Sequence, residues 1–389
     1  MPCSKPGRMG PMEDHGENDK GREWTPLLEE GRRRKSIEEE KHRKQKQKMT
    51  ALSTLLCVTL FILYSAASPA RIAPLHRRDL TLQVVHNQED DLQTALPVDF
   101  PDPSIVQDND GTWYAFATNS GGKNVQVAKA SSGRDPLGQW TRLNTDAMPD
   151  RSWTSGRNTW APDVKRLPDG SYIMYFSGEL PDTHQHCIGV ARSRKITGPY
   201  KPDAQPWACP RKQGGAIDAS GFLDEGTGRR YVVYKVDGNS MPGFTPCGTG
   251  VADPKLRTPL VLQEVDFLDG ATKRGNPVEI LNRVASEDGP LIEAPELTRR
   301  PDGTYVLFFS SHCFQDPKYN IKYAWSTSIQ GPYQRAAEPL LQTGDFGLSA
   351  PGGPTTAKIR GLLGSKDIMG FHGNCPGGRC FYTVQWGEA

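Results

Sequence analysis

The sequence predicts an all-β chain folded as a five-bladed β-propeller, and three observations predict it. A strand–turn–strand unit recurs five times between residues 99 and 389. Its turns contain Asp-Gly or other Asn/Asp-rich pairs flanked by β-rich residues, which are strong hairpin signals. Almost no stretch has the periodicity of an amphipathic helix. A β-sandwich is the alternative, but it would not explain five matched units, whereas a propeller repeats one blade around an axis.

The expected elements follow the chain in order. The paired strands of the five units are expected at 101–118, 161–178, 217–235, 294–311 and, with the weakest match, 357–373. Third strands are expected at 124–132, 187–200 and 319–333. The first strand of each propeller blade lines the central channel, so the starts of the units should converge although they are far apart in sequence.

Bulk composition excludes some classes of partner. The chain has 389 residues, of which 24% are charged, and a formal net charge of +2. That length allows one large domain with an ample core. The small net charge gives no overall field for nucleic acid, so no nucleic-acid partner is expected.

The first 98 residues differ in composition from the rest. Residues 1–48 read as a disordered polar tail, 49–70 as a signal-anchor or signal peptide, 71–98 as a stalk, and 99–389 as the propeller. The apolar run 51–67 follows the basic stretch 42–48, which favours a type II membrane anchor with the propeller lumenal or extracellular. Cleavage near Ala67 or Ala70 would instead give a secreted protein, and a start at Met49 would give a signal peptide of ordinary length.

Cysteine usage agrees with export. Six cysteines lie beyond residue 71, namely Cys187, Cys209, Cys247, Cys313, Cys375 and Cys380. An even number in an oxidising compartment predicts up to three disulfides, of which Cys375–Cys380 is the clearest because it would staple a hairpin. The cysteines and histidines form no metal-binding pattern, so no metal ligands are predicted.

Acidic residues fall at matched places when the units are aligned on their turn glycines. Ser104, Asp163 and Glu296 share one position, and Asp102 stands two residues before it. Asp218 in Asp-Ala-Ser matches Asp102 in Asp-Pro-Ser, and Glu293 matches Trp160. Three acids, Asp102, Asp218 and Glu293, are therefore expected where inner strands start. Such a set suits glycoside hydrolysis, in which one carboxylate activates water, another protonates the leaving oxygen, and a third raises the pKa of the proton donor.

These segments resemble glycoside hydrolase family 43, whose members are five-bladed propellers that invert stereochemistry on arabinose- or xylose-containing glycans. The resemblance covers about 99–388 and rests on DPSIVQDNDGTWYAFAT, WAPDVKRLPDGSYIMYFS, AIDASGFLD, IEAPEL and MGFHG…GRCFYTVQW. It implies that Asp102 is the general base, Glu293 the general acid and Asp218 the modulator of that acid. Two departures are Ala294, where the family usually has Gly, and Gly353, where many members have His.

Further site residues are expected around these acids. Trp160 is a candidate for stacking on sugar, whereas Trp113 fits the core equally well. Asp163 and Glu296 share a position in two blades, which favours an architectural role, and Asp163 is also a candidate for contacting substrate. The resemblance places His372 near the channel centre, by a structural ion or water, and Arg379 facing the sugar. His184 and His186 are expected on a loop surface.

The sequence thus predicts an inverting glycosidase of plant-type polysaccharides, with α-L-arabinosyl linkages first and β-xylosides second. No cofactor is expected to be required, and a structural Ca²⁺ or other ion in the channel is allowed. A propeller that binds glycan without cleaving it and a protein-interaction propeller are the alternatives. Endo or exo action depends on loop shapes that the sequence does not show.

Overall fold

The computed structural model describes residues 40–41, 44–45, 80–85, 91–244, 247, 253, 255–361 and 364–389. The chain divides into two compact units, residues 1–77 and 78–389. In the first unit the described residues are helical, and Lys44 Nζ lies 2.7 Å from Glu40 Oε1. The apolar run 51–67 lies outside the described residues. Within the described ranges, no helix has both the length and the apolar character needed to cross a membrane.

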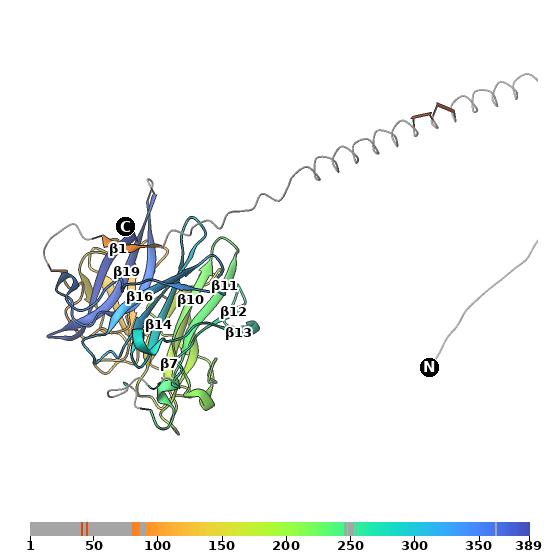
Figure 1. The fold of residues 1–389 in the computed structure, drawn as a ribbon. Helices are drawn as coiled ribbons and strands as arrows, with labels where there is room; N and C mark the ends of the chain where they lie inside the picture. The colour runs from red at the N-terminus through yellow and green to blue at the C-terminus, as the bar shows by residue number, and fades with distance from the viewer. Residues whose placement is uncertain are drawn as a thin grey trace, which may run out of the picture. The chain divides into compact units, whose positions relative to one another are not determined.

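The second unit is the five-bladed propeller that the repeats predict (Figure 1). Each blade is a four-stranded antiparallel sheet, with its first strand innermost for blades 1 to 4. The strands are β2 Ser104–Gln107, β3 Trp113–Ala117, β4 Gln126–Ala130 and β5 Trp140–Arg142 in blade 1; β6 Trp160–Arg166, β7 Tyr172–Glu179, β8 His186–Ser193 and β9 Lys201–Pro202 in blade 2; β10 Ala216–Asp224, β11 Arg229–Val236, β12 Leu260–Val265 and β13 Lys273–Leu281 in blade 3; β14 Ile292–Arg299, β15 Tyr305–Ser311, β16 Asn320–Ser326 and β17 Gln334–Arg335 in blade 4; and β18 Gly352–Gly361, β19 Gly364–Cys375, β20 Gly378–Glu388 and β1 Leu82–Val85 in blade 5. Short helices α2 (Ala285–Asp288), η1 (Arg211–Gln213), η2 (Gly238–Ser240) and η3 (Asp345–Gly347) lie in the connections.

The last blade closes the ring by combining both ends of the propeller. Strand β1 pairs antiparallel with β20, with Leu82 opposite Glu388. The backbone N–H of Ala95 also donates to the carbonyl of Phe381 at 2.9 Å. The segment 71–98, expected to be a stalk, therefore contributes at its described residues a strand of blade 5. This pairing joins the two ends of the propeller chain in one sheet and so closes the ring.

The hydrophobic core is divided among the interfaces between neighbouring blades. Five clusters of buried side chains occur, one for each interface. Phe116 and Phe176, for example, join blades 1 and 2, whereas Trp113 and Phe381 join blades 1 and 5. Trp113 is thus a core residue, 1% exposed. The apolar core thus lies between neighbouring sheets, whereas prolines and acidic side chains line the central channel.

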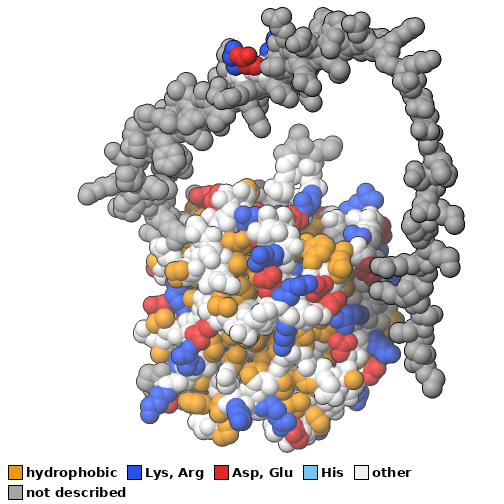
Figure 2. Space-filling view, turned by 90° about the vertical axis from the view of Figure 1, so that its right-hand side faces the viewer, with side chains coloured by type: hydrophobic (Ala, Val, Ile, Leu, Met, Phe, Trp, Pro, Cys, Tyr) orange, Lys and Arg blue, Asp and Glu red, His pale blue; other side chains and the backbone are white. Residues whose placement is uncertain are grey.

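Among the described residues three disulfides form. Cys375–Cys380 is one of them, as predicted, and the others are Cys187–Cys209 and Cys247–Cys313. On the face shown in Figure 2, Lys and Arg side chains alternate with Asp and Glu side chains. This mixture is consistent with the formal net charge of +2.

Candidate active site

The innermost strand of each blade starts with one residue in the left-handed backbone region. These residues are Asp102, Ala161, Asp218, Ala294 and Gly353, with φ of 53°, 43°, 58°, 50° and 62°. In blades 2 to 5 the strand pairing also shifts at this point, as in a β-bulge, which re-aims side chains at the end of a strand. Non-glycine residues adopt such a backbone at a cost of about 1–3 kcal/mol, and such strain is concentrated at functional sites.

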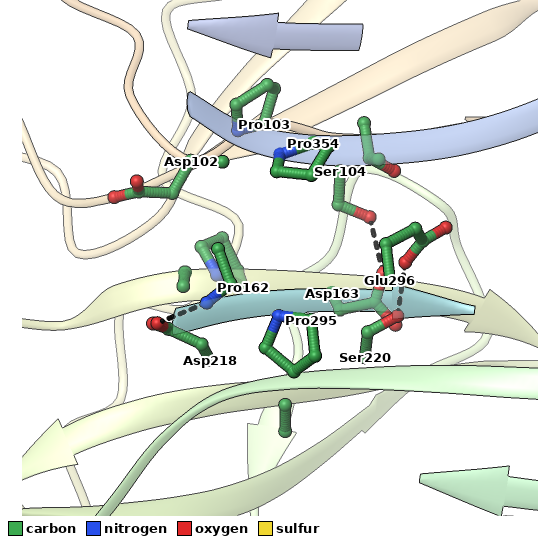
Figure 3. A pocket seen from close by; sticks show the side chains of 15 residues that line it. Asp102, Pro103, Ser104, Pro162, Asp163, Asp218, Ser220, Pro295, Glu296 and Pro354 are labelled. Atoms are coloured by element: carbon green, nitrogen blue, oxygen red, sulfur yellow. Dashed lines mark hydrogen bonds between the residues drawn. The ribbon is translucent and has the colours of Figure 1, made fainter. Parts of the chain in front are cut away.

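A ring of polar side chains closes the channel two residues further along each strand (Figure 3). Ser104 Oγ donates to Asp163 Oδ1 at 2.9 Å, and Asp163 Oδ2 accepts the N–H of Gly221 at 2.8 Å. Ser220 Oγ donates to Glu296 Oε2, whose other oxygen accepts the N–H of Thr356 at 2.9 Å. The cavity along this ring is only about 40 Å³. Asp163 and Glu296 therefore tie blades together, in agreement with the architectural role that their matched positions favour.

A larger pocket of about 290 Å³ is lined by all three acids that the sequence singles out. Asp102 comes from blade 1, Asp218 from β10 and Glu293 from β14, so the inner-strand starts do converge. Trp160 and Arg379, which are predicted to bind substrate, line the same pocket. Its other lining residues include His184, His186, Lys235, Asp237, Phe314, Tyr319 and the Cys247–Cys313 disulfide.

Asp102 is held as a carboxylate. Its Oδ2 accepts the Thr118 hydroxyl at 2.6 Å, and its Oδ1 lies 3.4 Å from Arg379 Nη1. Burial raises the pKa of Asp102, but the Arg379 charge and the Thr118 hydrogen bond outweigh burial, so the net pKa is below its usual value. An ionised, oriented carboxylate is what a general base requires.

Asp218 and Glu293 have contrasting surroundings although they face one pocket. Burial and the Glu293 carboxylate raise the pKa of Asp218 well above its usual value. Asp218 Oδ2 accepts the N–H of Ala294 at 3.0 Å. Glu293 receives a donor on each oxygen, from Tyr319 Oη at 2.9 Å and from Lys235 Nζ at 3.2 Å. Because its pKa is raised, Asp218 can hold a proton beside Glu293.

His372, which lies in β19, contacts the backbone of Asp102. It is fully buried, its Nδ1 accepts the N–H of Asp102 at 3.1 Å, and its ring stacks on Tyr319. Burial lowers the pKa of His372 to about 3, so the ring is neutral at physiological pH and its Nε2 carries the hydrogen. His372 Nε2 is buried and has no hydrogen-bond partner. Among the described residues no group of three His, Cys, Asp or Glu could hold a metal, and the structural ion stays a prediction.

Trp160 and His186 form a paired wall of the pocket. Their rings stack with centroids 3.6 Å apart, and His186 Nε2 donates to the Asn158 carbonyl at 2.9 Å. The expectation that His186 lies on a loop surface is wrong, because it is the first residue of β8 and 3% exposed. Burial of the imidazole against Trp160 fixes the indole that would contact a sugar.

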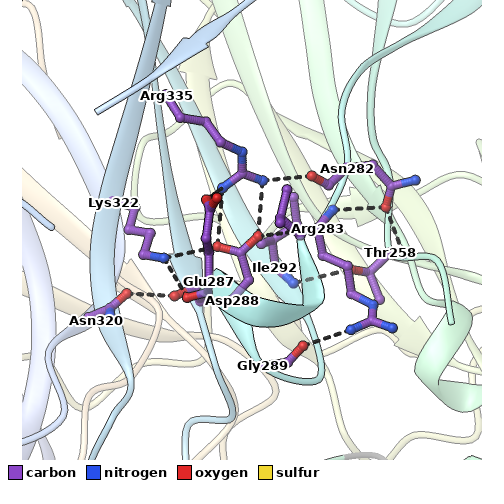
Figure 4. A network of polar contacts seen from close by, with 12 residues as sticks. Thr258, Asn282, Arg283, Glu287, Asp288, Gly289, Ile292, Asn320, Lys322 and Arg335 are labelled. Carbon is purple, nitrogen blue, oxygen red and sulfur yellow. Dashed lines mark hydrogen bonds and ion pairs between the residues drawn. The ribbon is translucent and has the colours of Figure 1, made fainter. Parts of the chain in front are cut away.

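A buried network anchors the segment that leads into β14 and Glu293 (Figure 4). Asp288 is 0% exposed, and its carboxylate lies 3.0 Å from both Lys322 Nζ and Arg335 Nη2. The N–H of Ile292 donates to Thr258 Oγ1 at 3.1 Å. Because these contacts come from blades 3 and 4, they fix the residue next to Glu293 from two sides.

Comparisons with known proteins agree with this geometry. The family model "Glycosyl hydrolases family 43" matches residues 94–383. The chain belongs to this family. An extracellular endo-α-(1→5)-L-arabinanase 2 of Bacillus subtilis is 28% identical over 273 residues, which cover 62% of this chain and 51% of that protein. A similarly named Thermotoga petrophila protein is 28% identical over 263 residues, covering 60% and 50%. This chain thus spans about half the length of these relatives.

A solved structure gives the same fold. The crystal structure of a thermostable family-43 glycoside hydrolase matches with a TM-score of 0.61 and 21% identity, covering 77% of this chain and 92% of that one. At 21% identity, this similarity shows the propeller fold and nothing about activity.

Two departures of this family 43 chain from the family's pattern now have a structural setting. Ala294 occupies a left-handed position (φ 50°) that glycine would adopt with less strain. Gly353 also has positive φ, and a Cβ there would lie 2.8 Å from His372 Nδ1. With His372 in this position, residue 353 has no room for a side chain.

Proposed function

We propose that the chain is a glycoside hydrolase that cleaves α-L-arabinosyl linkages of arabinan with inversion of configuration. The observation that carries the proposal is the convergence of Asp102, Asp218 and Glu293, from three blades, on one pocket. Family membership supports hydrolase chemistry. A pocket with one acid held ionised and a neighbouring pair able to hold a proton matches the two tasks of an inverting glycosidase.

In the proposed reaction each acid has one task. Asp102 removes a proton from a water molecule as the water oxygen attacks the anomeric carbon. The bond from that carbon to the glycosidic oxygen breaks, and Glu293 delivers its proton to the leaving oxygen. Asp218 tunes Glu293 through their shared charge. Arg379 keeps Asp102 ionised from 3.4 Å, and Trp160 offers a flat apolar face to the sugar.

Arabinan is favoured over xylan because two relatives are named as endo-acting arabinanases. The same names favour cleavage within the arabinan chain over release of terminal sugars. A β-xyloside is the second candidate, because the family likeness alone leaves the sugar open. A propeller that only binds glycan would not require the ionised Asp102 beside a second pair of acids.

We also propose that residues 71–389 act outside the cytosol. Three disulfides support this, because such bonds persist in oxidising compartments. The apolar run 51–67 would act as a membrane anchor or as a cleaved signal. N-terminal sequencing of the mature protein distinguishes the two, and also a start at Met49.

A product screen tests the proposed activity. Purified residues 71–389 are incubated with linear arabinan, arabinoxylan and aryl α-L-arabinosides or β-xylosides. We expect short arabino-oligosaccharides from linear arabinan, with the anomeric configuration inverted in an early NMR spectrum. Release of xylose alone would show that the substrate is a β-xyloside and not arabinan. Binding of arabinan without any sugar release would overturn the enzymatic proposal.

A further inference from the structure

Lys235 breaks a pattern that the other four blades keep. Five residues hold equivalent places on the second strands, opposite the residue that precedes each left-handed position: Thr118, Ser177, Lys235, Ser310 and His372. In four blades this side chain accepts the backbone N–H of the left-handed residue in the next blade, at 2.9–3.1 Å. A lysine ammonium has no lone pair and cannot do this. In blade 3 the Asp218 carboxylate accepts the N–H of Ala294 instead.

The lysine is nevertheless fully enclosed and charged. Its side chain is 0% exposed, and Nζ lies 2.9 Å from Asp237 Oδ1 and 3.2 Å from Glu293 Oε2. Burial lowers the pKa of Lys235, but the charges of Asp237, Glu293 and Asp218 outweigh burial and raise it above its usual value. Burying an ammonium group carries a desolvation penalty of several kcal/mol, which is offset only when counter-charges are well placed. A hydroxyl would serve the scaffold without that penalty, so a scaffold role does not account for Lys235.

The contacts of Lys235 indicate a role in the protonation of Asp218 and Glu293. With Lys235 on one oxygen and Tyr319 on the other, Glu293 is held in one orientation. Asp218 has no cation at hydrogen-bond distance among the described residues, and burial next to Glu293 favours its protonated form. A buried carboxyl group with a raised pKa beside the general acid can store the proton that the acid delivers.

We propose that Lys235 is a positioning residue that fixes Glu293 and keeps the shared proton on Asp218 until a glycosidic oxygen is bound. The proposal rests on the proposed function, since it assigns Lys235 to the same reaction. When the leaving oxygen takes the place of a donor at Glu293, the proton moves from Asp218 to Glu293 and then to that oxygen. After each cycle one proton enters the pair from solvent, and Asp102 releases to solvent the proton that it took from water.

The charges around the pair decide the direction of any pH effect. The titratable or charged groups that line the pocket or contact its acids are Lys235, Asp237, Asp102, Arg379, Tyr319, His372, His184 and His186. Of these, Lys235 contacts Glu293 directly as a cation, and Asp237 partly cancels its charge. Removing either group should therefore shift the proton affinity of the pair, in opposite directions.

Two substitutions with opposite expected shifts test the proposal. Lys235→Gln removes a positive charge, so the Asp218–Glu293 pair keeps its proton to higher pH. The alkaline limb of the pH profile of kcat/KM therefore moves to higher pH. Asp237→Asn removes a negative charge, so the same limb moves to lower pH. Lys235→Gln should also lower kcat roughly hundredfold on substrates with poor leaving groups, because Glu293 loses its fixed orientation. Lys235→Arg should restore the position of the limb.

A matched control is Lys165→Gln, which removes a lysine paired with Asp163 at 2.9 Å on the scaffold side of the channel. It should lower stability and leave the alkaline limb in place. A folded Lys235→Gln protein with an unmoved limb, or two charge variants that shift the limb in the same direction, would overturn the proposal. ¹³C-carboxyl NMR of labelled glutamate, with the Glu293 signal assigned by its loss in Glu293→Gln, gives the same shifts without substrate. If the wild-type protein releases no sugar, the proposed function fails, and the NMR titration still decides on Lys235.

Discussion

The inner hairpins of blades 2 and 4 have nearly the same sequence but present different side chains to the pocket. In β6–β7, Trp160 pairs with Ser177, and in β14–β15, Glu293 pairs with Ser310. Both hairpins then have a left-handed alanine and a shift in strand pairing. The next acids, Asp163 and Glu296, both hydrogen-bond across the channel to neighbouring blades.

The difference lies one residue before the shared part. The bulge presents the residue that precedes it to the pocket, and that residue is an aromatic ring in blade 2 and a carboxylate in blade 4. One backbone device thus presents two different side chains to the same pocket. Under the proposed function, the repeated residues build the channel, whereas the unrepeated ones take part in the reaction.

The largest expected effect separates the two glutamates of β14. Glu293→Gln removes the proton donor, so kcat on substrates with poor leaving groups should fall by about 10²–10⁴-fold. Aryl arabinosides with good leaving groups need less protonation and should lose less. Glu296→Gln is the matched control, because its amide can still accept from Thr356 and meet Ser220. Steady-state kinetics on both substrate types measures the contrast.

Two results would break this part of the comparison. A Glu293→Gln protein that loses equal activity on good and poor leaving groups would not be missing a general acid. A folded Glu296→Gln protein as inactive as Glu293→Gln would place the shared acid in the chemistry.

Much of this arrangement could be predicted from the sequence, because the matched hairpins have the same number of residues between the start of the inner strand and the turn. Counting back from the turn glycines put Asp102 and Glu293 at the starts of inner strands, and the match of Asp-Ala-Ser to Asp-Pro-Ser added Asp218. The structure brings the three acids to one pocket. The count works because one residue of slip would turn every side chain to the other face. The weakly matched fifth unit, 357–373, lies within β18 and β19.

Several residues of the pocket were not predicted as site residues. Lys235 ends the unit 217–235, and its alignment with Ser177 could have revealed it, but a lone lysine gives no hint of its partners. Tyr319 and His186 reach the pocket from connections and third strands, where no spacing links them to the acids. Strand β1 was missed because four residues of modest apolar character are a strand only when β20 offers an edge.

The second expected effect concerns the matched acids themselves. Asp163→Asn leaves Lys165, whose Nζ is 2.9 Å away, without its nearest counter-charge and should destabilise the fold by about 1–3 kcal/mol. Burial raises the pKa of Glu296, and Lys165 only partly offsets this, so Glu296→Gln resembles the protonated side chain and should cost less. Denaturant unfolding of both variants measures the difference. Equal losses in the free energy of unfolding would show that Asp163 and Glu296 carry the same charge in the folded protein.

The smallest expected effect concerns Asp218, which joins the two hairpins. Its N–H donates to Ser177 of blade 2 at 3.0 Å, and its carboxylate accepts the N–H of Ala294 in blade 4. Its pKa is raised in the folded protein above the unfolded value near 3.8. A carboxyl group of this kind stabilises the fold below pH 4 and loses that contribution as the pH rises toward the folded-state pKa.

Asp218→Asn removes this titration and keeps an acceptor for Ala294. The variant should lose activity yet melt higher than the wild type at pH 7, by roughly 2–4 °C for each kcal/mol regained. The advantage should shrink as the pH falls and vanish near pH 4, where the wild-type carboxyl is protonated in both states. Thermal unfolding from pH 4 to 8 measures this trend. A constant difference across that range would mean that Asp218 stores no proton, and that blades 2 and 4 are joined there by hydrogen bonds alone.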